Sequence, residues 1–242
     1  MSELKKTHRE VKEPQITSRY LADYMAASEI ARRSIVRKCK YQAISPVVQH
    51  REAKLSIAKF LRNGSKDFDE LNASSFGLRE RMADSDFDRD VLDHNADYID
   101  HFLKVQHKIQ LPDADRLPQG QTPPVEFAGV KVNVEVHCRF RRLTKTNKVR
   151  VGAAALRYRK GKALAEPVAE WQGAFLFGYL NMTGQEDEAQ PEHKLCLVID
   201  AWAGIAYSAP TDSVSRFNNM KAACATIAEQ WPEIKPPPGA VL

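Results

Sequence analysis

The first half of the chain repeats its hydrophobic residues at the spacing of amphipathic helices. Thr17 and Ser18 are good N-capping residues, and they precede Tyr20, Leu21 and Tyr24, which share one helical face. The same pattern predicts helices over residues 18–27, 28–40, 45–63 and 86–110. In the second helix we expect Ile30, Ile35 and Val36 to face inward, and Arg32, Arg33, Arg37, Lys38 and Lys40 to face outward.

The second half changes to the two-residue period of β-strands. Hydrophobic and polar residues alternate strictly from Val130 to Phe140, which predicts one half-buried strand of eleven residues. Residues 144–147 are a plausible turn, and residues 148–159 return as a second strand rich in small residues. We expect the helix at residues 167–182 to pack closely on those small residues. Further strands at 194–202 and 205–209 precede a final helix that begins at Ser213.

This order of elements predicts an α+β protein in which a helical N-terminal region is followed by a β-β-α-β-β-α sheet domain. Four prolines between residues 111 and 124 indicate a linker. The predicted divisions are a flexible arm (1–15), a helical domain (16–110), the linker (111–124), an α+β sheet domain (125–235) and a tail (236–242).

Composition narrows the class of protein. Hydrophobic residues make up 43% of the 242 residues, charged residues make up 28%, and no apolar run is long enough to span a bilayer. The first ten residues lack the apolar stretch of a secretory signal, so we expect a cytoplasmic protein with no membrane partner. The four cysteines are far apart and show no zinc-binding spacing, which favours reduced thiols.

Charge is unevenly distributed along the chain. The net charge of +5 divides into +8 over residues 1–64, −6 over 65–124 and +3 over 125–242. Between Arg139 and Lys162 the predicted hairpin has ten basic residues among 24 and no acid. The ten are Arg139, Arg141, Arg142, Lys145, Lys148, Arg150, Arg157, Arg159, Lys160 and Lys162. A ribbon of one charge sign indicates a phosphate-bearing partner, and nucleic acid is the first candidate.

A second basic surface is predicted on the helix at residues 28–40. Arg32, Arg33 and Arg37 would face outward there, after a preceding helix in a possible helix-turn-helix arrangement. These three arginines are therefore further candidates for nucleic-acid binding.

Candidate catalytic residues come from the acids of the sheet domain. Glu135 is followed by His137 on the same predicted strand face, and Asp200 ends a predicted buried strand. Two or three converging carboxylates with a lysine would suit Mg²⁺-dependent hydrolysis, although Asp200 also fits a structural role in a turn.

Residues 125–209 resemble the PD-(D/E)xK nuclease-like superfamily in the order of their elements: a hairpin, a buried helix with Gln172 and Tyr179, and then a strand. The resemblance implies Lys160 as a counterpart of the family lysine, with Glu135 and Asp200 as carboxylates. The signature acid is missing, because residues 156–160 read Leu-Arg-Tyr-Arg-Lys. This departure implies either a divergent enzyme or a form that only binds.

Three hypotheses follow. The first is a nucleic-acid-binding protein that uses the basic hairpin, in microbial DNA handling or defence. The second is a divergent nuclease, the only case in which we expect Mg²⁺ as a cofactor. The third is a protein-interaction subunit or homo-oligomer, in which the basic hairpin meets an acidic partner.

Overall fold

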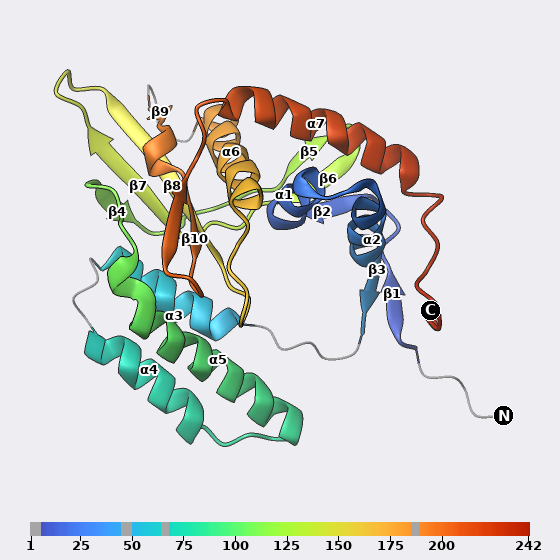
Figure 1. Ribbon diagram of the computed structural model, residues 1–242, viewed down its shortest axis with the longest axis horizontal. Coiled ribbons are helices and arrows are strands. Elements are labelled where there is room, and N and C mark those ends of the chain that lie inside the picture. Colours follow the sequence, from blue (N-terminus) through green and yellow to red (C-terminus); the bar gives the residue numbers. More distant parts are fainter. Residues whose placement is uncertain (1–5, 45–49, 64–67, 185–188) are drawn as a thin grey trace.

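The computed structural model describes residues 6–44, 50–63, 68–184 and 189–242. The fold is α+β, as the sequence predicts, with helices in the N-terminal half and then a mixed sheet (Figure 1). The start of the third predicted helix, at 45–49, lies outside the described residues. The helices are α1 (Ser18–Ala26), α2 (Glu29–Lys40), α3 (Arg51–Arg62), α4 (Phe68–Glu80), α5 (Asp86–Val105), α6 (Glu166–Thr183) and α7 (Ser213–Gln230), with short 3-10 turns η1 (Gln106–Lys108) and η2 (His193–Leu195).

The main sheet has the strand order β11-β10-β8-β7-β4, and the short β9 also pairs with β8. Its strands are β4 (Asp115–Leu117), β7 (Cys138–Leu143), β8 (Val149–Arg157), β9 (Gln190–Pro191), β10 (Leu197–Asp200) and β11 (Ile205–Ser208). β8 runs antiparallel to β7 and parallel to β10, and the order β7-β8-α6-β10-β11-α7 confirms the predicted β-β-α-β-β-α arrangement.

Two smaller sheets complete the fold. One joins β2 (Gln15–Thr17), β6 (Val130–Asn133) and β5 (Val125–Phe127), and the other pairs β1 (His8–Glu10) with β3 (Tyr41–Ala43). β1 thus lies within the predicted arm at 1–15, and β4 lies within the predicted linker at 111–124.

Helices cover both faces of the main sheet (Figure 1). On one face Ala153, Ala155 and Val198 share a core with α1, α6 and α7. On the other face Phe140, Leu156 and residues of β10 share a core with α3, α4 and α5. Because both faces are buried, β8 is apolar at consecutive positions, as in sheets that are covered on both sides. The helical half therefore packs directly on the sheet through shared cores.

The predicted strand from Val130 to Phe140 is wrong in its continuity. β6 ends at Asn133, the chain leaves extended pairing over residues 134–137, and β7 begins at Cys138 in a different sheet. The alternation of buried residues continues through the break, but Val132 and Val136 lie in one core while Cys138 and Phe140 lie in the other. A two-residue period indicates which side chains are buried and does not indicate the core that receives them.

The small residues of β8 have two different neighbours. Ala153 and Ala155 lie in the core that contains α6, as expected. At Gly152, however, the prediction that the helix at residues 167–182 is the neighbour is wrong. A Cβ at this position would lie 2.1 Å from the backbone oxygen of Leu195 in η2. The glycine is required by a backbone that approaches the strand more closely than any side chain allows.

Two residues of α2 differ from the pattern-based prediction. Ile30 was expected inward and is 86% exposed, whereas Lys40 was expected outward and is buried. The Lys40 Nζ donates hydrogen bonds to the carbonyls of Trp231 (2.7 Å), Pro232 (3.3 Å) and Ile234 (3.2 Å), just beyond α7. The C-terminal end of a helix attracts a cation, and this contact overrides the helical periodicity.

Candidate functional site

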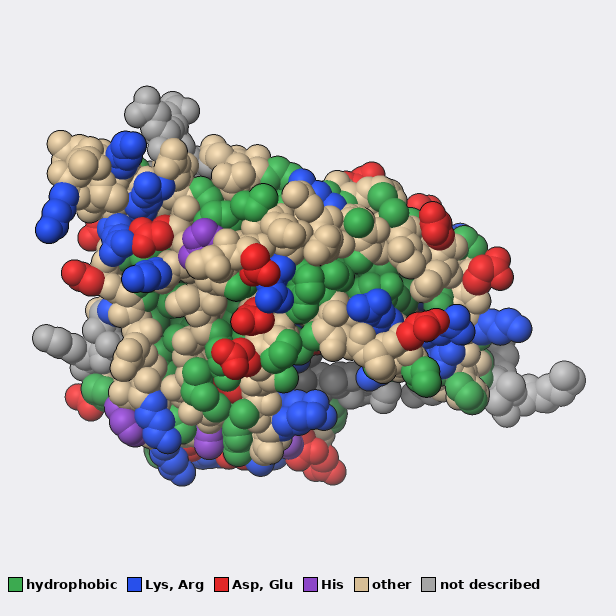
Figure 2. Space-filling view, turned by 45° about the horizontal axis from the view of Figure 1, so that its top comes forward, with side chains coloured by type: hydrophobic (Ala, Val, Ile, Leu, Met, Phe, Trp, Pro, Cys, Tyr) green, Lys and Arg blue, Asp and Glu red, His purple; other side chains and the backbone are tan. Residues whose placement is uncertain are grey.

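The turn of the β7–β8 hairpin is exposed and basic. Lys145 and Lys148 lie in it, and neither forms an ion pair with another described residue. The predicted turn is confirmed by hydrogen bonds from the backbone N–H of Asn147 to the Thr144 carbonyl (3.0 Å) and from Thr144 to the Lys148 carbonyl (2.9 Å). Figure 2 shows Lys and Arg side chains gathered at the corner of the molecule where Figure 1 places this turn.

Along the body of the hairpin most basic side chains have protein partners. Arg142 pairs with Glu192, to which its Nε donates at 3.0 Å, and Arg150 donates to Gln190. Arg139 donates to the carbonyl of Gln121 at 2.7 Å, and Arg141 is half-buried on β7. The ten basic residues therefore do not form one continuous strip of available charge. The acidic loop after α6 supplies Glu192, while its residues 185–188 lie outside the described residues.

At the other end of the hairpin the charges divide into buried and exposed groups. Arg157 is buried and pairs with Asp23 of α1, and burial lowers the pKa of Arg157 although the carboxylate beside it acts in the opposite direction. Lys160 lies 3.6 Å from Asp97 of α5. Arg159 and Lys162 are exposed and form no ion pair with the described part of the chain.

The predicted basic helix, α2, also satisfies its arginines internally. Arg32 donates to the carbonyls of Tyr24 (3.0 Å) and Met25 (3.3 Å), and its guanidinium lies over the Tyr24 ring. Arg33 pairs with Glu29 at 3.7 Å, and Arg37 is half-buried. These contacts leave α2 with less free charge than its sequence indicates.

The candidate catalytic residues have separate partners. The Asp200 Oδ1 accepts the backbone N–H groups of Trp202 (2.9 Å) and Ala203 (3.1 Å), and its Oδ2 accepts that of Leu164 (2.6 Å). This geometry is that of a carboxylate closing a turn. Lys160 contacts Asp97 and has no described contact with Asp200 or Glu135. Among the described residues, no group of three or more His, Cys, Asp or Glu side chains is arranged to hold a metal ion.

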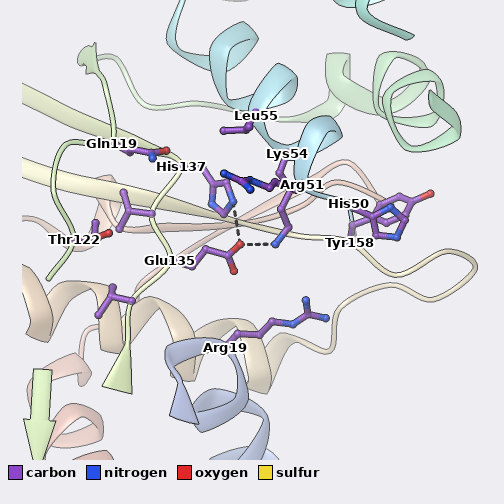
Figure 3. A pocket seen from close by; sticks show the side chains of 12 residues that line it. Arg19, His50, Arg51, Lys54, Leu55, Gln119, Thr122, Glu135, His137 and Tyr158 are labelled. Carbon is purple, nitrogen blue, oxygen red and sulfur yellow. Dashed lines mark hydrogen bonds and ion pairs between the residues drawn. The ribbon is translucent and has the colours of Figure 1, made fainter. Parts of the chain in front are cut away.

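Glu135 lies in a cavity of about 540 Å³, which we call the central cavity (Figure 3). Five segments form its walls: the start of α1, the start of α3, the chain between β4 and β5, the irregular chain between β6 and β7, and the residue after β8. The lining residues are Arg19, His50, Arg51, Lys54, Leu55, Gln119, Thr122, Val134, Glu135, Val136, His137 and Tyr158.

Glu135 is held from two sides. Its Oε1 lies 2.5 Å from the Lys54 Nζ and 3.3 Å from the His137 Nε2, both shown as dashed lines in Figure 3. The His137 Nδ1 accepts the backbone N–H of Leu156 at 3.1 Å, so in the neutral ring the proton is on Nε2 and is donated to Glu135. Burial raises the pKa of Glu135, but the bond from His137 and the charge of Lys54 outweigh it and bring the pKa to about 2. Glu135 is therefore ionised at neutral pH and is poorly suited to be a general base.

Tyr158 lines the cavity as part of an aromatic cluster. Its ring stacks on Tyr98 with centroids 3.7 Å apart, and His50 meets both rings edge to face. Burial raises the pKa of Tyr158 to about 12 and lowers that of His50. Tyr158 is only 9% exposed, so it is a core residue at the cavity wall and has no free face on which a base could stack.

A second cavity of about 330 Å³ shares Arg19 and Tyr158 with the first, and we call it the adjoining cavity. Its wall includes Lys38 of α2 and the exposed Arg159 and Lys162 of the loop after β8. Five cations that line the two cavities form no ion pair with any described residue: Arg19, Lys38, Arg51, Arg159 and Lys162. Their acidic neighbours are occupied, since Glu135 pairs with Lys54, Asp23 pairs with Arg157, and Asp200 accepts backbone N–H groups.

Sequence reasoning identified Glu135, His137 and the charges after β8 but did not identify Arg19, Lys38, Arg51 or Lys54 as site residues. The alternation gave no signal for this site, because it places Glu135 on the polar face of its predicted strand, and the cation that pairs with Glu135 is distant in sequence. The sequence does not specify which of 36 basic residues supplies it, because Lys54 is 81 residues away.

Comparison with protein-family models gives no match, and comparison with curated proteins gives none either. Within the described residues, none of the helices has both the length and the apolarity needed to cross a membrane.

Proposed function

We propose that this protein binds single-stranded nucleic acid along the two adjoining cavities, with the turn of the β7–β8 hairpin as a second contact. The observation that carries the proposal is a set of five cations that have no ion-pair partner among the described residues and that line two cavities with Arg19 and Tyr158 in common: Arg19, Lys38, Arg51, Arg159 and Lys162. Cations left unpaired at neighbouring positions repel one another, and a chain of phosphates relieves that repulsion.

The extent of the charge favours a polymer over a small anion. A single phosphorylated metabolite would fill one cavity, whereas these cations line two, and Lys145 and Lys148 add charge at the far end of β8. The nine residues of β8 separate that turn from the cavities by roughly 25–30 Å at 3.3 Å per residue. Several successive phosphates are needed to reach both positions.

Hollows favour a single strand over a duplex. A duplex presents its phosphates on the outside of a rigid rod and would meet only the rim of each cavity. A single strand is flexible enough to place its phosphates against Arg19 and Arg51 inside the central cavity. The interface differs from the one expected from sequence: the body of the hairpin and the arginines of α2 contribute little, because Arg142, Arg157, Arg32 and Arg33 are already engaged, and α2 contributes Lys38 instead.

The experiment is a fluorescence anisotropy titration with a 20-nucleotide single strand, as DNA and as RNA. Arg159→Gln and Lys162→Gln together should weaken binding about tenfold or more at 0.1 M salt and reduce the magnitude of the salt slope by about 1.4, at 0.7 per lost phosphate contact. Lys145→Gln with Lys148→Gln should have a smaller effect.

Arg33→Gln is the matched control for the single cavity variant Arg159→Gln, because this exposed arginine pairs with Glu29 and lines neither cavity. Equal weakening by the control and the cavity variant would reduce the interaction to general net charge and contradict the proposal. Wild-type protein that binds no nucleic acid but co-purifies with an acidic protein would favour the interaction-subunit hypothesis instead.

A metal-dependent nuclease is not favoured by any specific contact in the described residues. Asp200 uses its oxygens on backbone N–H groups, and Glu135 is engaged by Lys54 and His137. We therefore assign Glu135, Asp200 and Lys160 no catalytic role in the proposed function.

A further inference from the structure

The charge of the central cavity exceeds what one internal phosphodiester would neutralise. Its lining includes Arg19, Arg51 and Lys54 as cations and Glu135 as the only carboxylate. Arg19, Arg51, Lys54 and Glu135 together carry a formal net charge of +2. An internal phosphodiester carries one negative charge, whereas a phosphate monoester carries about −1.5 to −2 at pH 7.

Two cations of the central cavity, Arg19 and Arg51, are available to bind a phosphate monoester. Arg19 comes from α1 and Arg51 from α3, on different walls of the cavity (Figure 3), and neither forms an ion pair with a described residue. The guanidinium of Arg19 thus has unused hydrogen-bonding capacity, since its Nε is buried and has no hydrogen-bond partner in the described part of the chain.

The start of α3 adds positive potential to the same wall. Its N-cap residue, His50, makes no side-chain capping bond, and the N–H of Ala53 is satisfied by Asn95 Oδ1 at 2.9 Å. The residues of this first turn that line the cavity, His50, Arg51 and Lys54, come from the end of the helix at which the dipole favours an anion. This contribution supports the two arginines and is not needed to explain the site.

Glu135 does not disqualify the cavity as an anion site. Its Oε1 accepts from both Lys54 and His137, so its charge is directed at donors of the protein. The same contacts fix Lys54, whose side chain is 19% exposed, at the cavity wall. Glu135 is thus a positioning residue for the cation that completes the site.

We propose that the central cavity binds a phosphate monoester, the terminal phosphate of a nucleic-acid strand, between Arg19 and Arg51. This inference rests on the proposed function and adds a preference for strand ends. A volume of about 540 Å³ lies within the range of about 300–1,000 Å³ typical of ligand pockets, which leaves room for the terminal nucleotide as well as its phosphate.

The test compares three forms of one 20-nucleotide strand: a 5′-phosphate, a 3′-phosphate, and hydroxyl groups at both ends. One of the phosphorylated forms should bind about tenfold more tightly than the hydroxyl form, the factor expected from hydrogen bonds to an added charge. Arg51→Gln, an exposed position in the first turn of α3, and Arg19→Gln should each abolish this preference. Arg159→Gln, in the adjoining cavity, should weaken all three strands equally and keep the preference.

The outcomes separate this inference from the proposed function. Equal binding of all three strands, with equal weakening by Arg51→Gln and Arg159→Gln, would overturn the terminal-phosphate site and leave single-strand binding intact. A preference that persists in both Arg19→Gln and Arg51→Gln would also overturn it. If a nucleoside monophosphate or inorganic phosphate binds wild type but no strand does, the nucleic-acid function fails and the anion is a free metabolite, which overturns the assignment to a strand end.

Discussion

Replacing Glu135 by Gln should lower stability and strengthen anion binding at the same time. The change keeps the shape of the side chain but removes the charge that pairs with Lys54 and accepts from His137. Lys54 is 19% exposed and His137 is nearly buried, so both lose a partner that water replaces only in part. The cavity meanwhile gains one unit of positive charge.

The size of the stability loss follows from the pKa of Glu135. A folded-state pKa of about 2, against an ordinary value of 4.5, corresponds to at most about 3.4 kcal/mol. Glu135 is 37% exposed, so solvent screening reduces this bound, and we expect a loss of about 1–2 kcal/mol at pH 7.

The sign of the pH dependence is also determined. The folded-state pKa lies below that of the unfolded chain, so the stabilisation is complete above about pH 4.5 and is lost as the pH falls toward 2. Urea unfolding followed by circular dichroism, at pH 7 and at steps between pH 4.5 and 2.5, measures this contribution. Wild type should lose stability more steeply over this interval than Glu135→Gln does.

The control is Glu229→Gln on α7, an exposed glutamate with no ion pair to a described residue. If Glu135→Gln is as stable as wild type at pH 7 and has the same pH profile, the ion pair with Lys54 and the bond from His137 do not hold the cavity wall. If the variant is destabilised yet binds oligonucleotides less tightly than wild type at equal salt, Glu135 contacts the ligand itself, and its assigned positioning role is wrong.

Three further substitutions test the fold around the site by chemical denaturation. Gly152→Ala places a methyl group 2.1 Å from the Leu195 backbone oxygen and should destabilise the protein by about 1–3 kcal/mol. The control is Gly161→Ala, at a left-handed glycine whose added Cβ meets no atom within 4 Å, so that it reports backbone strain alone. Equal losses of stability in the two variants would exclude crowding by η2. Lys40→Met removes the donor to three carbonyls beyond α7 and should lower the free energy of unfolding by about 1.5–3 kcal/mol, and an unchanged value would show that water replaces Nζ there. Asp23→Ala leaves Arg157 buried without its carboxylate and should lower the free energy of unfolding by up to about 3 kcal/mol. This is the lower end of the range for buried pairs, because the Asp23 side chain is 27% exposed. If the double variant Asp23→Ala with Arg157→Leu regains stability, the uncompensated charge of Arg157 is the cause of the loss.

Local signals in the sequence predicted much of the fold. Thr17 caps α1 through a bond from the Tyr20 N–H to its Oγ1 at 3.1 Å, and the order of strands and helices after residue 137 matches the hydrophobic pattern. These features depend on neighbours a few residues apart. The break at residues 134–137 was not predictable in this way, because both cores accept the same alternation of apolar side chains.

The candidate site depended on contacts between distant segments, and there the sequence was a weaker guide. The charge count over residues 139–162 was correct, but Glu192, Gln190 and Asp23 engage Arg142, Arg150 and Arg157. Conversely, the local sequence does not mark Arg19 or Arg51 as binding residues, because neither belongs to a run of basic residues. They enter the proposed site because α1 and α3 bring them to the same cavity, where neither has an ion-pair partner among the described residues.

The central claim, that the cavities bind a single strand, is tested most directly by the salt dependence of oligonucleotide binding to the full-length wild-type protein. The five cations of the two cavities, with Lys145 and Lys148 at the hairpin turn, predict that the logarithm of the association constant falls with the logarithm of salt concentration with a slope of about −3.5 to −4.9, at 0.7 per phosphate contact. The measurement is an anisotropy titration of a 20-nucleotide single strand from 50 to 300 mM NaCl. A slope between about −3 and −5 supports the account; a slope near zero, or no binding at 50 mM salt, contradicts it.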